Sequence, residues 1–169
     1  LQKTTFTFDV SVWEIFMPLC KGAKMVLCTR TAAGSPEQLL QLIEKEKITC
    51  LHFVPAMLSV FLSYAREVAD AGEKVRSLRR VMASGEALLP ETVAEWYGNF
   101  EVPLHNLYGP TEASVDVTCY PTLPYDHIIP IGRPVWNTWI YILDESGHLQ
   151  PPGISGEICI GGDQVARGY

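Results

Sequence analysis

The middle of the chain alternates between short apolar runs and longer segments with helical spacing. The runs at residues 48–54 and 80–84 predict buried strands, and a further strand is expected at 103–105. Pro55 and Pro90 come after the first two runs, and proline is favoured at the first position of a helix. Because strands that alternate with helices are typical of βαβ units, this order predicts an α/β fold built on a parallel sheet.

Two more helices and one more strand are predicted before this region. Ser35 followed by Pro36 predicts a helix start, and residues 22–28 form an apolar run that predicts a buried strand. Ser11 with Glu14 three residues later matches a capping box, so a helix is expected to begin at Ser11. The side chains expected on one face of that helix are Trp13, Phe16 and Met17.

The pattern changes after residue 115. Strand-like runs at 117–120, 138–143 and 157–160 follow one another with turns and no helical segment between them. This predicts an antiparallel, barrel-like sheet, so we expect an α/β subdomain at residues 1–122 and a partial antiparallel β subdomain at residues 123–169. The chain begins with Leu and stops directly after a patterned segment, so we expect a fragment of a larger domain.

Composition excludes several classes of protein. The 169 residues are 47% hydrophobic and 19% charged, which indicates a globular domain. Thirteen Lys and Arg against nineteen Asp and Glu give a net charge of −6, which argues against a nucleic-acid groove. No apolar run approaches the ~20 residues of a membrane span. None of the five cysteines forms a Cys-x-x-Cys pair, so a reducing, cytoplasmic location is expected.

The heptapeptide Asn106–Glu112 carries the clearest chemical signal. Gly109 and Pro110 predict a tight bend after a strand, and Tyr108 offers a flat face on which a base can stack. Thr111 can donate a hydrogen bond to a phosphate oxygen, and Glu112 can hold a hard cation such as Mg²⁺. A solvated loop with an ordinary turn is the alternative.

The carboxyl ends of parallel strands are where open α/β sheets bind their ligands. Asp9 could pair with an ammonium group, and His52, Ser84 and Asp116 could hydrogen-bond a small hydroxyl. The residues expected in a binding site at these strand ends are Asp9, Trp13, His52, Met82, Ser84, Leu107, Tyr108, Thr111, Glu112 and Asp116.

Each of these residues also has a simpler interpretation. His52 could be a structural histidine, Ser84 could belong to the turn before Gly85, and Asp116 could be a solvated edge charge. A Ser-His-Asp hydrolase is a further alternative, although the Gly-x-Ser-x-Gly elbow is absent from the sequence.

Three segments together resemble the successive core motifs of adenylation domains of nonribosomal peptide synthetases. They are Phe8–Glu14, Asn106–Glu112, and Gly156–Gly162 followed by Val165–Tyr169; Pro130–Pro134 with Asn137 and Thr138 is similar to the same family. The resemblance covers essentially the whole chain and implies the adenylate-forming, acyl-CoA synthetase-like fold. It implies an enzyme that activates an amino acid with ATP and Mg²⁺ and releases pyrophosphate. The aminoacyl group would pass to the phosphopantetheine of a neighbouring carrier domain, beside a condensation domain.

The resemblance also implies a role for each site residue. Asp9 would hold the α-ammonium of the substrate, Thr111 and Glu112 would be catalytic, and Glu112 would bind the metal. The nucleotide would be bound by Gly85, Glu86, Asn106, Tyr108, Gly109 and Thr111. The specificity pocket would be Asp9, Val10, Trp13, His52, Met82, Ser84, Leu107, Val115 and Asp116, a combination that resembles the pattern for L-serine.

The family's phosphate loop, its ribose-binding aspartate and its catalytic lysine are not among these residues, so we expect that this fragment alone does not turn over. Three alternatives remain at this point: an acyl- or aryl-acid adenylate-forming ligase, a non-catalytic module of a synthetase, and a nucleotide-binding regulatory domain. Asp9 argues against the first, because a ligase of plain acids has no ammonium to bind.

Overall fold

The computed structural model describes residues 1–168, and its centre is a five-stranded mixed sheet in the order β1-β2-β3-β4-β5. Strands β1 (Cys50–Phe53), β2 (Arg80–Ala83) and β3 (Leu104–Tyr108) are parallel, which confirms the predicted arrangement. Strands β4 (Thr118–Pro121) and β5 (Arg133–Pro134) extend the same sheet in antiparallel orientation.

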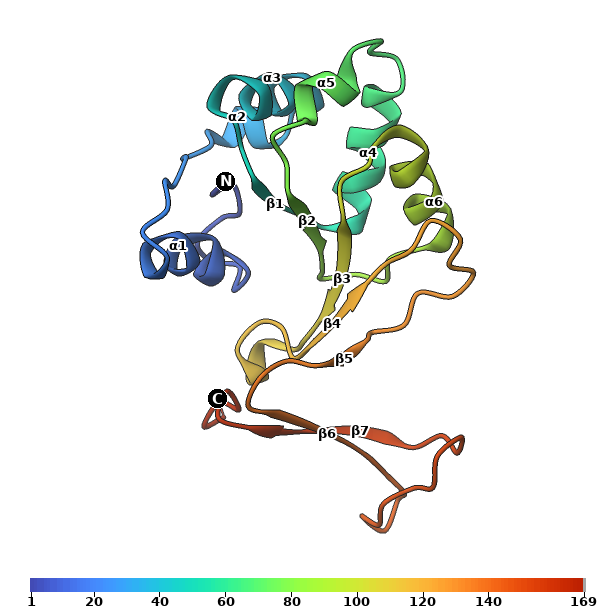
Figure 1. The fold of residues 1–169 in the computed structure, drawn as a ribbon. Helices are drawn as coiled ribbons and strands as arrows, with labels where there is room; N and C mark the ends of the chain where they lie inside the picture. The colour runs from blue at the N-terminus through green and yellow to red at the C-terminus, as the bar shows by residue number, and fades with distance from the viewer. Residues whose placement is uncertain (169) are drawn as a thin grey trace.

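Most helices lie on one side of this sheet, as Figure 1 shows. They begin where prolines predicted them to begin: α3 at Pro36–Glu46, α4 at Pro55–Ala65 and α6 at Pro90–Asn99. Ser35 caps α3, since its hydroxyl accepts a hydrogen bond from the backbone of Gln38. Two short helices, α2 (Arg30–Ala33) and α5 (Ala71–Val75), were not predicted.

The hydrophobic core lies between those helices and one face of the sheet. Because side chains alternate along a strand, the register partners Leu51, Val81 and Leu104 point to the same face, and all three are buried in the core. Trp96 of α6 is also buried, and its indole donates to the carbonyl of Val102 at 2.7 Å. The opposite face is therefore free to carry polar groups.

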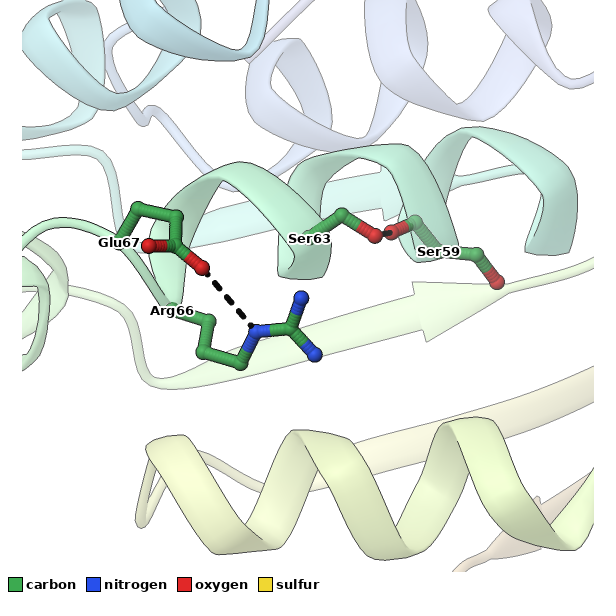
Figure 2. A network of polar contacts seen from close by, with 4 residues as sticks. All are labelled: Ser59, Ser63, Arg66 and Glu67. Atoms are coloured by element: carbon green, nitrogen blue, oxygen red, sulfur yellow. Dashed lines mark hydrogen bonds and ion pairs between the residues drawn. The ribbon is translucent and has the colours of Figure 1, made fainter.

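The outer surface of α4 is held by local polar contacts, drawn in Figure 2. The hydroxyl of Ser63 donates to the carbonyl of Ser59 at 2.9 Å, and Arg66 pairs with Glu67 at 3.4 Å. Contacts on the exposed face of one helix contribute little to stability. A substitution on this face is therefore a suitable control for substitutions in the site.

Helix α1 (Ser11–Cys20) lies apart from the core helices: strands β1 to β3 separate it from α4 and α6 (Figure 1). The helix begins at Ser11 as predicted, but the predicted capping box is wrong. Glu14 instead accepts hydrogen bonds from the backbone of Lys3 at 3.1 Å and from the backbone and hydroxyl of Thr4, both at 2.9 Å. The carboxylate is buried and ties the preceding segment to the helix.

Trp13, Phe16 and Met17 lie at helical positions that share one face of α1, but Phe16 and Met17 are 57% and 39% exposed, and the helix packs through Ser11, Glu14 and Pro18. Another prediction near the start of the chain is wrong. Residues 22–28 form no extended strand: Leu27 makes one isolated bridge to Gln2 and is 68% exposed. An apolar run predicts a buried strand only where another strand lies beside it to pair with.

The last part of the chain forms an antiparallel pair, β6 (Thr138–Leu143) with β7 (Glu157–Gly162), which confirms antiparallel strands there. β5 belongs to the central sheet, so the division at residues 122 and 123 stays a prediction. Tyr169, the end of the last resembling motif, lies outside the described residues. Within residues 1–168, no helix is long and apolar enough to cross a membrane.

The buried Glu14 gives a first testable prediction. Replacing Glu14 with Ala should lower the free energy of unfolding by about 2–3 kcal/mol, because the donors of Lys3 and Thr4 lose a charged acceptor. Glu14→Gln keeps one carbonyl acceptor and should lose less than half of that amount. Urea titration of the full-length protein, followed by a tryptophan signal from α1, measures both; equal losses for the two variants would contradict the assignment.

Candidate functional site

The base of the site is the sheet face opposite the core. His52, Met82 and His105 are register partners on β1, β2 and β3, so their side chains point to this face. Ser84 follows two residues after Met82 and lies on the same side. His52 Nε2 and Ser84 Oγ are 3.0 Å apart, and the two residues are only 1% and 2% exposed. The structure therefore brings together two of the predicted polar residues.

Helix α1 contributes the wall of the site. The rings of Trp13 and His52 meet edge to face, with centroids 5.8 Å apart and an interplanar angle of 87°. Trp13 Nε1 and His52 Nδ1 are both buried, and neither has a hydrogen-bond partner in the described part of the chain. A buried polar atom without a partner costs about 1–3 kcal/mol, so both atoms are suited to a polar ligand.

Asp116 lies in the same cluster. Burial, which has the largest effect, and the negative charge of Asp9 together raise the pKa of its carboxyl to about 6, while the nearby hydroxyl of Ser84 and indole of Trp13 act in the opposite direction. Three neighbouring side chains therefore act on one carboxyl group. Asp9 lies close enough to Asp116 to act on its pKa, as expected if both residues belong to one binding site.

Asp9 is also joined to the heptapeptide loop. The hydroxyl of Thr111 donates to Asp9 Oδ2 at 2.7 Å. Thr111 and Glu112 begin a short 3₁₀ turn directly after β3 and Pro110. This hydrogen bond connects the start of α1 to the loop at the carboxyl end of the sheet.

The environment of His52 keeps the imidazole uncharged. Burial, which has the largest effect, and the positive charge of Lys3 together lower its pKa to about 3. A neutral ring has one N–H donor and one acceptor nitrogen. In a Ser-His-Asp triad the aspartate accepts from His Nδ1, but His52 Nδ1 has no partner in residues 1–168. The geometry therefore argues against the hydrolase alternative.

Three of the residues expected to bind a nucleotide, Asn106, Tyr108 and Glu86, do not join this cluster. Asn106 and Tyr108 alternate with Leu107 along β3 and so point to the other face, where Asn106 Nδ2 donates to the carbonyl of Pro130 at 2.9 Å. Glu86 accepts from the backbone of Ala56 at 3.1 Å, which satisfies a free N–H at the start of α4. Their nucleotide contacts stay a prediction.

Two glycines of the expected nucleotide-binding set, Gly85 and Gly109, are required by the conformation of the backbone. Gly85 has φ +91, in the left-handed region. A Cβ at Gly109 would lie 2.3 Å from the carbonyl oxygen of Val115, so only glycine allows the loop to fold back against β3.

The remaining pocket candidates are apolar. Met82 is buried beside Cys50, with Sδ and Sγ 3.9 Å apart, and Leu107 is half-buried on the same sheet face. Val10 is buried at the start of α1, and Val115 has φ 83, an unusual value for a β-branched residue. Their contacts with a substrate stay predictions.

Glu112 fits a magnesium ion that also binds phosphates. Its side chain is exposed, and the described residues contain no group of three or more His, Cys, Asp or Glu side chains that could hold a metal by themselves. Mg²⁺ is commonly bound through one or two carboxylates plus phosphate oxygens and water. A single free carboxylate next to the Thr111 hydroxyl agrees with that mode.

Sequence reasoning missed Lys3, whose charge acts on His52 and whose ammonium lies 5.3 Å from the centre of the Phe53 ring. It also missed the contacts of the loop with Gln164, whose carbonyl accepts from Ser114 Oγ at 2.7 Å. No motif or spacing joins these positions, because each contact forms only when distant segments fold together.

The raised pKa of Asp116 predicts a dependence of stability on pH. Because the pKa is higher in the folded than in the unfolded protein, stability should fall as pH rises from about 4 through about 6. Asp116→Asn cannot ionise and should remove on the order of 1–2 kcal/mol of that fall. Unfolding midpoints of both proteins across this range test it; parallel curves would contradict a raised pKa at Asp116.

Comparisons with known proteins identify relatives of this chain. The chain is 46% identical over 176 residues to vanchrobactin synthetase VabF of Vibrio anguillarum, covering 100% of this chain and 6% of the relative. It is 42% identical over 174 residues to enterobactin synthase component F of Escherichia coli, covering 99% of this chain and 13% of the relative. The chain thus spans a small part of these relatives.

Solved structures share the fold. A four-domain nonribosomal peptide synthetase bound to AMP and glycine matches with a TM-score of 0.87 and 32% identity, over 99% of this chain and 12% of that one. A protein with adenylation and PCP domains matches with a TM-score of 0.86 and 26% identity, over 99% and 34%. Residues 1–169 match the profile of the family described as AMP-binding enzyme. The chain therefore belongs to the AMP-binding enzyme family.

Proposed function

We propose that this chain is the amino-acid-binding part of an adenylation domain in a nonribosomal peptide synthetase, and that its substrate is L-serine. The observation that carries the proposal is one cluster of polar side chains, in which Asp9 acts on the carboxyl of Asp116 and His52 hydrogen-bonds to Ser84. An α-ammonium and a small hydroxyl are the two groups that such a cluster fits.

The ammonium of the substrate is assigned to Asp9. Asp9 accepts a hydrogen bond from the hydroxyl of Thr111, a neutral donor. An ammonium is charged and forms a stronger hydrogen bond to a carboxylate than a hydroxyl does, so a substrate amine can take the place of Thr111. The displaced hydroxyl of Thr111 then becomes free to donate to a phosphate oxygen.

The hydroxyl of the substrate is assigned to the Asp116 side. It can donate to the carboxyl of Asp116 and accept from Trp13 Nε1, a buried donor that lies near this carboxyl but makes no hydrogen bond of normal geometry. Alanine offers no such group and would leave those partners unpaired. An ammonium side chain could donate to Asp116 but could not accept from Trp13.

Glu112 and the nucleotide residues complete the proposed site. Glu112 would hold Mg²⁺, which neutralises charge on the phosphate oxygens when the substrate carboxylate attacks. The residues assigned to the nucleotide are Gly85, Glu86, Asn106, Tyr108, Gly109 and Thr111. The proposed partners are a carrier domain with its phosphopantetheine and a condensation domain, in the cytoplasm. An aryl- or acyl-acid ligase is the second candidate, and it leaves Asp9 without a role.

The function is tested by amino-acid-dependent ATP–pyrophosphate exchange in the full-length protein, meaning the complete synthetase to which these 169 residues are proposed to belong. Serine should give the highest rate among the amino acids. Asp116→Ala should lower kcat/KM for serine by about 10–100-fold and lower that for alanine by less than about threefold, because only serine loses a partner. A higher rate with alanine, or with an acid that has no amine, would overturn the assignment.

The exchange of partners at Asp9 gives a second prediction. Thr111→Ala removes the competing donor, so serine should bind about three- to tenfold more tightly in the absence of ATP. The same variant should lose any cooperativity between serine and a non-hydrolysable ATP analogue, since the two ligands no longer share Thr111. Thr111→Ser keeps the hydroxyl and should behave as the unmodified protein does. Calorimetry measures both affinities; weaker serine binding by Thr111→Ala would contradict the exchange.

A further inference from the structure

The loop that carries Glu112 and Asp116 has an unusual backbone. Ser114 and Val115 are consecutive non-glycine residues with positive φ values of 57 and 83. Such values are uncommon for any residue with a side chain and a genuine outlier for valine. Conformations of this kind persist only where neighbouring structure holds them in place.

Contacts from two sides hold this loop. On the inner side, the backbone of Val117 donates to the carbonyl of Tyr108 at 2.7 Å, and the loop presses against Gly109. On the outer side, the segment after β7 makes two hydrogen bonds to it. Ser114 Oγ donates to the carbonyl of Gln164, and the backbone of Ala166 donates to the carbonyl of Glu112, both at 2.7 Å.

The segment after β7 is itself fixed to the end of the β6–β7 pair. The backbone of Asp163 donates to the carbonyl of Asn137 at 3.2 Å. A Cβ at Gly162 would lie 2.2 Å from the same carbonyl oxygen, so the chain passes very close to Asn137 at this point. A continuous set of contacts therefore runs from β6 to Ser114.

We propose that Ser114 is a positioning residue for the two carboxylates that lie two positions before and after it, Glu112 and Asp116. The role rests on the proposed function of the site. The hydroxyl of Ser114 fastens the loop to Gln164 and keeps the backbone in its left-handed conformation. Without that bond the loop relaxes, and the carboxylates of Glu112 and Asp116 rotate away from the metal and the substrate hydroxyl. Ser114 itself touches neither ligand.

The test compares variants of Ser114 in the full-length protein. Ser114→Ala removes the hydroxyl, and the dissociation constant of serine measured by calorimetry without nucleotide should rise about three- to tenfold. The Mg²⁺ concentration for half-maximal pyrophosphate exchange should rise by a similar factor. Ser114→Asn should restore both values, because asparagine tolerates positive φ and its amide can donate to Gln164.

The matched control is Ser63→Ala, which removes a hydroxyl bonded within α4 (Figure 2) and should change neither value. Ser114→Gly tolerates positive φ without the hydroxyl; it should show the same rise as Ser114→Ala, and it carries the test if the alanine variant does not fold. The role is overturned if the alanine and glycine variants bind serine as Ser63→Ala does, or if Ser114→Asn resembles Ser114→Ala. A lack of amino-acid-dependent exchange in the unmodified protein would overturn the proposed function together with this role.

Discussion

Two carboxylates, Asp9 and Asp116, lie close enough to repel each other, and the rest of the site depends on how the fold brings them together. Burial and the charge of Asp9 raise the pKa of Asp116, so this pair of carboxylates is electrostatically unfavourable. An ammonium beside Asp9, as in the proposed substrate, would relieve that repulsion. Glu14 is essential to this arrangement, because it ties the segment before Asp9 to helix α1.

The neutral state of His52 has the same physical origin. The ring lies between Trp13 and Ser84 with almost no exposure to water, and Lys3 adds a positive charge from the neighbouring segment. A charged imidazole would repel the ammonium of the proposed substrate. The uncharged ring instead supplies one donor and one acceptor, which suit the hydroxyl of that substrate.

The sequence predicts the parts of this structure that follow from local patterns. Apolar runs and prolines located β1, β2, α4 and α6, and strand alternation placed Met82 and Ser84 on one face. The predictions fail where the contacts of a residue are made with another segment of the chain. Glu14 matches a capping box, but its partners are Lys3 and Thr4. The bond between Ser114 and Gln164 has no local pattern at all, since it joins the loop after β3 to the end of β7.

The two faces of the central sheet therefore have separate tasks. Leu51 and Phe53 pack into the core on one face, while His52 between them points to the site on the other. The core face has ample apolar burial to stabilise the strands. The site side of the fold can then tolerate unpaired polar atoms, repelling carboxylates and a valine at positive φ, each of which is unfavourable for folding. Strand alternation thus allows a stable framework and an energetically unfavourable polar cluster to be built from adjacent residues.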